Sequence, residues 1–349
     1  MEKKKIVFLY TEIATYFLAC LKALAERETE IVVIHWPVNK EAPFQFTFPD
    51  KVTFRLRTEF STDDELIGFV KEEDPEILYC SGWIDKGYLR VCKKFKSKIP
   101  VIVGLDNQWK GSLRQHVSTI VAPFWIHSHF SHCWVPGPFQ EKYARKLGFE
   151  SGKIITGVYS CDFDFFHEQY LLHRDAKAMQ FPRRLIYVGR YYEFKGICEL
   201  WEVFAQLAPS YPDWELWCLG TGDLSPFSHP AIRHFGFVQP ADMKYYIQNT
   251  GIFILPSHFE PWGVVIHEFA AAGFPLICSD AVGARTSFVE DDYNGYIYKA
   301  ADRGELRSAL ERIMGSDTQR LLEMSDRSAK VAGKITPSRW AEQLISLTK

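Results

Sequence analysis

The sequence predicts an α/β protein with two domains, each a doubly wound parallel sheet. Short apolar runs alternate with helical periodicity over most of the chain, which is the pattern of strand–helix–strand units. A length of 349 residues, at about 150 residues per domain, indicates roughly two domains. Hydrophobic residues make up 47% and charged residues 24% of the chain, which is a globular composition and excludes a disordered or fibrous protein.

In the first half, apolar runs predict strands at residues 6–10, 31–35, 52–56, 77–80, 101–105, 133–135 and 154–156. Amphipathic periodicity between them predicts helices at residues 14–27, 64–73, 86–96 and 140–147. The stretch 164–183 is polar and mixed and lacks the rhythm of a strand, so it is the predicted linker.

In the second half, strands are predicted at residues 185–188, 216–219, 252–255 and 276–279. Helices are predicted at residues 197–207, 241–248, 264–272 and 303–314, and a tail helix at 338–348. The expected organisation is a first domain at 1–163, a second at 184–335 and a C-terminal helical segment at 336–349. Two open parallel sheets of similar size predict domains facing across a cleft at the carboxyl ends of their strands, where such sheets bind ligands.

Charge and composition exclude several classes of partner. A net charge of -2 provides no field that attracts nucleic acid, so no nucleic-acid partner is expected. The eight cysteines are scattered singly, mostly in apolar runs, which predicts reduced thiols in a cytoplasmic protein. The first residues resemble the start of a signal peptide, but Glu12 interrupts the apolar stretch, and no apolar run is long enough to span a membrane. Nothing in the sequence indicates an oligomeric state.

The first chemical signal is the segment YVGRYYEFKG. Arg190 and Lys195 lie on a loop between a predicted strand and a predicted helix, so both cations are expected at the carboxyl edge of the sheet. An Arg fork and a Lys point charge at this spacing can bind adjacent phosphates of a diphosphate. The alternative interpretation is a pair of solvated surface cations.

The second signal is the segment PSHFEPWGVVIHEF, which leads from a predicted strand into a predicted helix. Pro261 and Gly263 suit a helix start, where the free amides of residues 262–265 and the helix dipole favour an anion. Glu260 and Glu268 flank this point and can accept hydrogen bonds from hydroxyls on either side of a phosphate. The pattern predicts a nucleotide-sugar site, against the alternative of a capping Glu260 and an ordinary exposed Glu268. A zinc site at His267 is excluded, because position 271 is an alanine.

Together these motifs resemble the retaining glycosyltransferases of family 4, also called glycosyl transferases group 1, which have the GT-B fold. The resemblance covers about residues 135–298 and includes a trailing N-G-Y-I-Y segment. The matching positions are Gly189, Arg190, Lys195, Gly196, Gly220, Gly222, Pro256, Ser257, Glu260, Glu268, Ala271, Gly273 and Pro275.

The resemblance implies a role for each site residue. Arg190 and Lys195 would hold the donor diphosphate and act in catalysis, as would Glu260, which contacts the transferred sugar. Glu268 would bind the ribose. The remaining donor contacts are expected at the base, near the turn 234–238, and at backbone groups beside the phosphates: Gly222, Phe237, Pro261, Trp262, Gly263 and Val264.

The resemblance also implies the reaction. A hexose-type sugar would move from a nucleoside diphosphate sugar, UDP- or GDP-linked, to a glycan, lipid-linked or small-molecule acceptor bound by the first domain. No cofactor or metal is expected, because Arg, Lys and helix amides neutralise the diphosphate. The tail helix would pack back on the first domain. The alternatives are a non-catalytic nucleotide-sugar-binding partner protein, or another GT-B activity such as a sugar epimerase or phosphorylase.

The first half departs from the family pattern. The family's glycine-rich loop after strand one is replaced by a sequence in which Thr11 or Glu12 would occupy the same place. Asp106 stands roughly where family members place a histidine near the donor sugar, so it is a fourth catalytic candidate. Its alternative interpretation is an Asx turn or a helix cap.

Two further patterns allow a functional and a structural interpretation. The basic residues between 86 and 98 could dock weakly on an anionic leaflet, which would place the protein peripherally at the inner face of the membrane, but a solvated helix face is favoured. His127, His129 and His132 suggest a metal cluster, yet their spacing fits no familiar site and leads into a buried strand.

Overall fold

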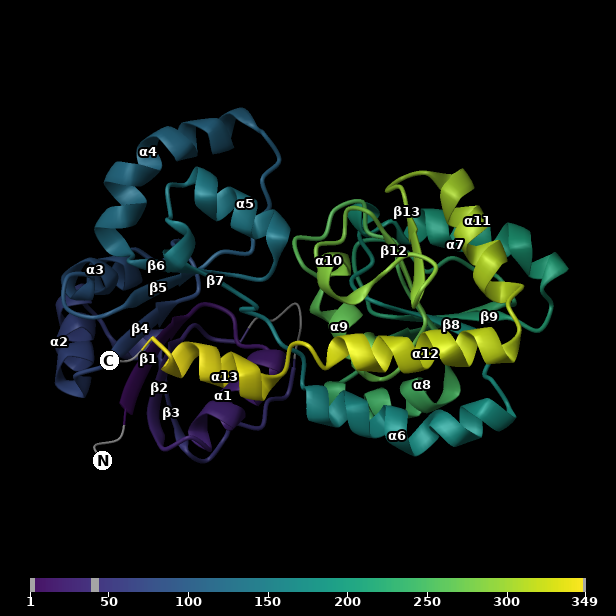
Figure 1. Ribbon diagram of the computed structural model, residues 1–349, viewed down its shortest axis with the longest axis horizontal. Helices are drawn as coiled ribbons and strands as arrows, with labels where there is room; N and C mark the ends of the chain where they lie inside the picture. Colours follow the sequence, from purple (N-terminus) through teal and green to yellow (C-terminus); the bar gives the residue numbers. More distant parts are fainter. Residues whose placement is uncertain (1–3, 39–43, 348–349) are drawn as a thin grey trace. The chain divides into compact units, whose positions relative to one another are not determined.

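The computed structural model describes residues 4–38 and 44–347, which fold into two compact units (Figure 1). Unit 1 contains the chain up to residue 162 together with the segment from residue 335 onward, and unit 2 contains residues 163–334. The chain therefore returns to unit 1 after completing unit 2.

Unit 1 is built on a parallel sheet of seven strands. The strands are β1 (Lys4–Tyr10), β2 (Thr29–His35), β3 (Val52–Leu56), β4 (Ile77–Cys80), β5 (Val101–Gly104), β6 (His132–Val135) and β7 (Ile154–Thr156). Their order in the sheet is β3-β2-β1-β4-β5-β6-β7, so the direction of winding reverses between β1 and β4. Thr11 follows β1 at this reversal, and its amide donates to Ser81 Oγ after β4 at 2.9 Å.

Helices cover both faces of this sheet. They are α1 (Thr15–Ala25), α2 (Asp63–Glu73), α3 (Lys86–Phe95), α4 (Leu113–His129), α5 (Pro138–Lys146) and α13 (Pro337–Ile345). Val7 and Leu9 of β1 belong to the core cluster that includes residues of α2 to α5, whereas Ile6 and Phe8 belong to the cluster that includes residues of α1 and α13. The strands are buried on both faces, which is why they are continuous apolar runs in the sequence.

The tail helix α13 lies on unit 1 beside α1. The Trp340 ring stacks on Trp134 with 4.9 Å between ring centroids, and its indole nitrogen donates to the carbonyl of Val158 at 2.9 Å. The last two positions of the expected C-terminal segment, 348 and 349, lie outside the described residues.

Unit 2 is built on a parallel sheet of six strands. They are β8 (Arg184–Val188), β9 (Glu215–Leu219), β10 (Ile232–Gly236), β11 (Ile252–Leu255), β12 (Leu276–Ser279) and β13 (Gly295–Tyr298). Their order is β10-β9-β8-β11-β12-β13, so here the winding reverses between β8 and β11.

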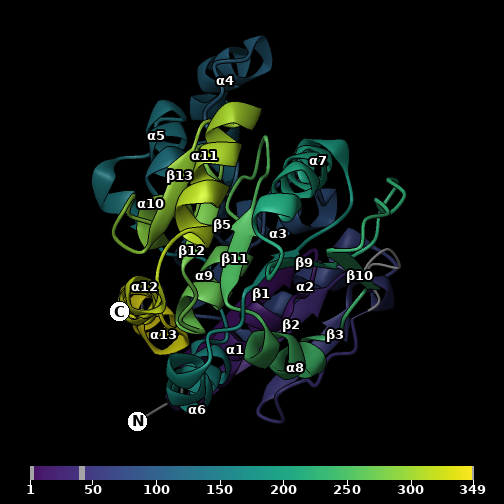
Figure 2. The same cartoon turned by 90° about the vertical axis from the view of Figure 1, so that its right-hand side faces the viewer.

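The helices of unit 2 form two groups. They are α6 (Phe163–Met179), α7 (Ile197–Leu207), α8 (Met243–Asn249), α9 (Val264–Ala271), α10 (Arg285–Phe288), α11 (Arg303–Met314) and α12 (Thr318–Ala332). α7 packs with α11, while α6, α8, α9 and α12 pack together. Figures 1 and 2 show the two groups on opposite faces of the sheet.

The stretch 164–183 is not a linker, contrary to the prediction from its mixed composition. Most of it is α6, which is a part of unit 2. Tyr170 and Arg174 both donate hydrogen bonds to Asp326 of α12, at 2.8 and 2.9 Å. The ammonium of Lys177 lies 4.0 Å from the ring centre of Phe274. The polar residues that suggested a linker are therefore those that hold α6 to its neighbours.

Burial of Lys177 makes the stability of unit 2 depend on pH. Desolvation lowers the pKa of Lys177 to about 7. An unfolded lysine titrates near about 10.4, so the unfolded chain takes up the proton first as the pH falls. The free energy of unfolding therefore falls between about pH 10 and pH 7. Lys177→Met is expected to raise stability by on the order of 1 kcal/mol at pH 7 and by less at pH 10.

Denaturant unfolding at the two pH values measures this effect. Lys244→Met is the matched control, because Lys244 also lies over a phenylalanine, Phe165, but is exposed. A Lys177→Met variant that is equally stabilised at both pH values would show that packing, and not the buried charge, is responsible.

Candidate functional site

The predicted phosphate-binding residues lie where the strand order of unit 2 reverses. The loop after β8 carries Arg190 and Lys195, and the loop after β11 carries Glu260. Both loops leave the carboxyl ends of the two strands that flank the reversal. This is the position at which open parallel sheets bind ligands, because the diverging loops leave a crevice there.

The loop after β8 is held by contacts with β8 itself and with the loop after β11. Tyr187 donates from its hydroxyl to the Arg190 carbonyl at 2.8 Å, and the His258 amide of the β11 loop donates to the Phe194 carbonyl at 2.9 Å. Gly196 closes the loop with φ of +66°, and a Cβ there would lie 2.1 Å from the Pro256 carbonyl oxygen. Only glycine allows this approach, so Gly196 fixes where Lys195 lies.

Lys195 and Glu260 form an ion pair between the two loops, from Nζ to Oε2. Their side chains are only 17% and 14% exposed. A charge-assisted contact this far from water is stronger than a surface pair, and it leaves a costly unpaired charge if either partner is removed. The pair brings together two residues that the sequence assigned to the diphosphate and to the transferred sugar.

The Glu260 loop is positioned from the opposite side by the chain after β12. The Glu260 amide donates to the Ala281 carbonyl at 3.2 Å, and the Gly283 amide donates to the Glu260 carbonyl at 3.0 Å. The Ala284 amide donates to the Trp262 carbonyl at 2.8 Å. The backbone of the loop is thus fixed before any ligand binds.

Helix α9 begins directly after this loop. Gly263 precedes it with φ of +89°, and no side chain caps its first turn. The first amides of a helix have no partners within the helix, so this end of α9 favours an anion. Nearby, the Trp262 indole nitrogen and the Ser257 hydroxyl are buried without a hydrogen-bond partner among the described residues. The sequence predicts only backbone contacts for Trp262.

Glu268 lies one turn further along α9. It is half-buried and shares the open face of the helix with Val264 and Val265, whereas Ile266 is buried. At 1.5 Å per residue, Glu268 is about 6 Å along the axis from the first residue of α9. His267 faces the other way, where its Nε2 lies 3.0 Å from the Ala332 carbonyl.

The loops after β9 and β10 complete this edge of the sheet. The Gly220 amide donates to the Gly236 carbonyl at 2.7 Å, and the Tyr191 amide donates to the Thr221 carbonyl at 2.9 Å. Gly222, predicted beside the base, packs against the backbone of Tyr191, where a Cβ would lie 2.4 Å from the carbonyl oxygen. A close approach between loops therefore accounts for this glycine.

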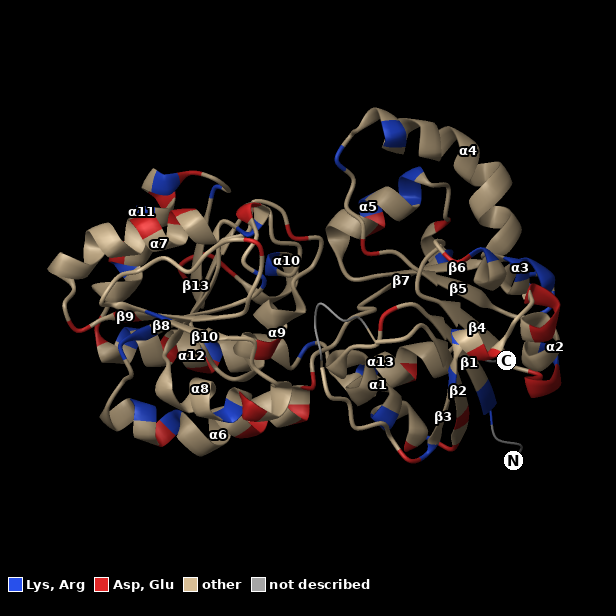
Figure 3. Ribbon diagram, turned by 180° about the vertical axis from the view of Figure 1, so that it is seen from behind, with Lys and Arg blue, Asp and Glu red and all other residues tan. Residues whose placement is uncertain are grey.

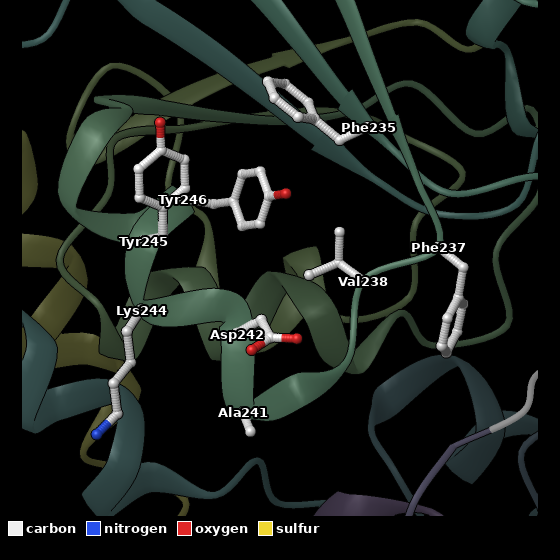
Figure 4. A pocket seen from close by; sticks show the side chains of 8 residues that line it. All are labelled: Phe235, Phe237, Val238, Ala241, Asp242, Lys244, Tyr245 and Tyr246. Atoms are coloured by element: carbon white, nitrogen blue, oxygen red, sulfur yellow. The ribbon is translucent and has the colours of Figure 1, made fainter.

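Phe237, the other residue predicted beside the base, lines a hollow of about 490 Å³ between β10 and α8 (Figure 4). Figure 4 shows aromatic rings around it, with the ammonium of Lys244 pointing away from the rings. Gly222 does not line this hollow, so the two predicted base residues do not share it. The full lining is Phe235, Phe237, Val238, Ala241, Asp242, Lys244, Tyr245 and Tyr246.

Asp106 lies in unit 1, just after β5, and is half-buried. Its carbonyl accepts a hydrogen bond from Gln140 Nε2 at 3.2 Å. Burial raises the pKa of the Tyr159 hydroxyl above its usual range, and a hydrogen bond with Asp106 adds to this effect. Asp106 also lies close enough to Tyr16 to raise the pKa of that hydroxyl, after burial as the main cause. The structure thus gives Asp106 tyrosine neighbours.

The histidines of the segment WIHSHFSHCW do not form a metal cluster. His127 Nε2 lies 2.9 Å from the Leu147 carbonyl, and His129 Nδ1 lies 2.7 Å from the Trp125 carbonyl. Burial, helped by the nearby Lys153, lowers the pKa of His132 to about 4. Within residues 4–38 and 44–347, no three His, Cys, Asp or Glu side chains are grouped to hold a metal ion.

Three further expectations concern the cysteines, the membrane-spanning helices and the basic helix α3. All eight cysteines are free, and only Cys198 is not buried. In the part of the chain that the structure describes, no helix is long and apolar enough to cross a bilayer. On α3, Lys93 and Lys94 are exposed while Leu89, Val91 and Cys92 are buried, so these lysines lie on the outer side of the helix.

Comparisons with known proteins find a family match within unit 2. Residues 182–316 match the family model described as glycosyl transferases group 1. An uncharacterized glycosyltransferase of Haemophilus influenzae is 25% identical over 165 residues, which are 45% of this chain and 46% of that protein. The glycogen synthase of Mycobacterium tuberculosis is 28% identical over 142 residues, 38% of this chain and 34% of that protein. The chain thus matches less than half the length of these curated relatives.

The crystal structure of Anabaena HepE in complex with UDP and glucose is similar over both units. It covers 98% of each chain with a TM-score of 0.71 and 15% sequence identity. This likeness shows the fold, which is GT-B with two Rossmann-like domains. The predicted fold class and the resemblance to this glycosyltransferase family are confirmed.

Proposed function

We propose that this chain is a retaining glycosyltransferase that moves a hexose-type sugar from a nucleoside diphosphate sugar to an acceptor. The observation that carries the proposal is the contact of Lys195 with Glu260 beside the start of α9. A cation for phosphate and a carboxylate for sugar hydroxyls meet there, next to a helix end that favours an anion. The family match on residues 182–316 supports the same assignment.

The leaving diphosphate would be stabilised by positive charge from the protein. Arg190, Lys195 and the first amides of α9 are the proposed donors, and charge stabilisation of this kind is usually the largest catalytic contribution. These groups supply what a divalent metal would otherwise supply, so we propose a reaction without a metal. Lys195 would then be shared between Glu260 and the diphosphate when the donor is bound.

Retention follows if the acceptor attacks on the face that the diphosphate leaves. The bond from the anomeric carbon to the phosphate oxygen breaks, and its electron pair departs with the diphosphate. The acceptor oxygen forms the new bond, and its proton passes to the departing phosphate oxygen. Glu260 would orient the sugar through its hydroxyls, and Asp106 is a further catalytic candidate, which lies in unit 1.

The base would lie beside Phe237. β10 is two strands away from β8, and neighbouring strands are about 4.8 Å apart, so the ends of β10 and β8 are separated by roughly 10 Å. That separation suits the reach from a diphosphate to the base of the same nucleotide. The HepE structure contains UDP, which makes a UDP-sugar the first donor to test.

A thermal-shift screen against UDP-, GDP-, ADP- and TDP-sugars, followed by a hydrolysis or transfer assay, tests the function. Binding raises stability by RT ln(1 + [L]/Kd), so one base should give the largest shift, and its sugar should be turned over. A shift without turnover under any acceptor would favour the non-catalytic binding protein. No shift and no turnover with any of the four would remove the proposal.

Glu268→Gln tests the ribose contact. The substitution keeps the shape but weakens the acceptance of a hydroxyl hydrogen bond, so we expect the donor KM to rise about tenfold and kcat to stay within about twofold. Steady-state kinetics with the donor varied measures both. Glu193→Gln, on the exposed part of the β8 loop, is the control and should leave both constants unchanged. A fall in kcat with an unchanged KM would contradict the assignment.

A further inference from the structure

Helix α4 of unit 1 carries a row of apolar side chains that are not buried in the core of unit 1. The row, which we term the α4 face, consists of Leu113, Val117, Ile120, Val121 and Phe124. At 3.6 residues per turn these positions span an arc of about 100°. All five are exposed, Ile120 at 72% and Phe124 at 82%. Scattered exposed apolar residues are ordinary, whereas a continuous row along one helix marks an interaction surface.

The α4 face points away from unit 1. Ala122 and Ile126 are the buried residues of α4, and they belong to the core between α4 and the sheet. On the helical wheel they lie on the side opposite the α4 face. Figures 1 and 2 show α4 as the outermost helix of unit 1. An ordinary surface helix has polar residues on this outer side.

The sequence around the α4 face is strongly basic. Between residues 86 and 140 there are eight Lys or Arg and one acidic residue, Asp106, in a chain with a net charge of -2. Lys110 and Arg114 lie at the start of α4, and Lys93 and Lys94 are exposed on α3, which packs against α4. Figure 3 shows α4 without any acidic residue.

The acidic residues near α3 lie on its other neighbour. α2 carries them, and its Asp63 pairs with Arg90 of α3 at 2.7 Å. Arg90 is therefore already neutralised by an acidic partner. Lys110 and Arg114, by contrast, lie at the start of α4 itself.

We propose that the α4 face lies in an anionic lipid leaflet, with the neighbouring lysines and Arg114 at the level of the head groups. An apolar stripe with flanking cations is the pattern of helices that lie in the plane of a membrane surface. At 1.5 Å per residue, the 17 residues of α4 extend about 26 Å, and their apolar row covers one side only, so α4 lies on the bilayer and does not cross it. This role goes beyond sugar transfer and does not depend on it.

A second copy of the chain fits the α4 face less well. In a two-fold contact that aligns the two α4 helices in parallel, Lys110 and Arg114 of one copy would lie beside the same residues of the other, and like charges in an interface oppose association. A protein partner would need a groove for a helix that stands out from its unit. A leaflet that carries negative head groups satisfies both the apolar row and the charge.

Co-sedimentation of the full chain with vesicles tests the proposal without any donor. We expect binding to phosphatidylcholine vesicles that contain about 30 mol% phosphatidylglycerol, at least about tenfold weaker binding to phosphatidylcholine alone, and weaker binding at high salt. The double variant Ile120→Asp with Phe124→Asp should lower the partition coefficient at least about tenfold. Leu171→Asp with Leu172→Asp, at exposed positions of α6, is the control and should bind like the wild type.

A second variant tests the role of the lysines, and two results would contradict the proposal. Lys93→Glu with Lys94→Glu leaves the apolar row intact and should remove the preference for the anionic lipid. Melting curves of all variants should match the wild type, because the changed side chains are exposed. Equal binding of the wild type to both vesicles would overturn the proposal. So would a lipid-free dimer that the Ile120→Asp, Phe124→Asp variant abolishes while vesicles bind neither protein.

Discussion

Replacing Lys195 by alanine is expected to lower kcat about 10²- to 10³-fold, and Glu260→Ala should have an effect of similar size. Lys195 would stabilise charge that develops on the diphosphate, and the loss of one such donor typically costs this much. Glu260 both orients the sugar and holds the lysine through the ion pair. Steady-state and single-turnover kinetics with the best donor measure the loss.

Stability separates the catalytic role from the structural one. Each single variant removes one partner from an ion pair whose side chains are only 14 to 17% exposed, so both should melt below the wild type. The double variant removes both charges and should recover part of the lost stability while remaining inactive. Arg303→Ala, which breaks the exposed pair with Glu202, is the control and should change neither quantity much. A double variant that regained activity would show that the pair is structural.

The positions of the site residues could be predicted because they depend on local features of the sequence. Strands β8 and β11 are apolar runs that are buried on both faces, so their ends are visible without a structure. Arg190, Lys195 and Glu260 follow these ends directly. The parallel order of the two strands then places both loops at one edge. The contact between Lys195 and Glu260 depends on side-chain geometry across 65 positions of sequence, which no local pattern contains.

Elements that lack an apolar pattern could not be predicted. β10 lies at the edge of its sheet, and only Ile232 of its five residues is buried. β13 begins with a glycine whose Cβ would lie 1.8 Å from the Leu276 carbonyl oxygen, so its place depends on backbone packing. Helix α12 buries Ser325 and Ser328, which bond to Gly273 and to Asn294. Two positions on the buried side of α12 are therefore polar, which weakens the apolar periodicity set by Leu321 and Met324.

Helix α4 was missed for a different reason. Pro123 lies inside it, and proline lacks the amide that a helix interior uses. Its apolar residues also occupy two opposite sides, one for the core and one forming the α4 face, so the usual single stripe is absent. The second apolar side, which obscures the periodicity of the helix in the sequence, is also the feature that indicates its proposed function.

Gly220→Ala is expected to destabilise unit 2 by about 3 kcal/mol or more and to abolish donor binding. Gly220 has φ of +135°, a conformation that an alanine does not tolerate, and its Cβ would lie 1.9 Å from the Gly189 carbonyl oxygen. The backbone would have to move apart where β8 and β9 end, and that movement would displace the loop that carries Arg190.

Gly68→Ala in α2 is the matched control, since no atom lies within 4 Å of its Cβ and alanine favours a helix by up to about 1 kcal/mol. Without the donor, the Gly220→Ala protein should melt below the wild type and the Gly68→Ala protein at or above it. The donor should raise the melting temperature of the Gly68→Ala protein but not that of the Gly220→Ala protein. A Gly220→Ala protein that melts like the wild type and still binds donor would contradict this prediction. It would show that the close approach of Gly220 to Gly189 does not constrain this edge of the sheet.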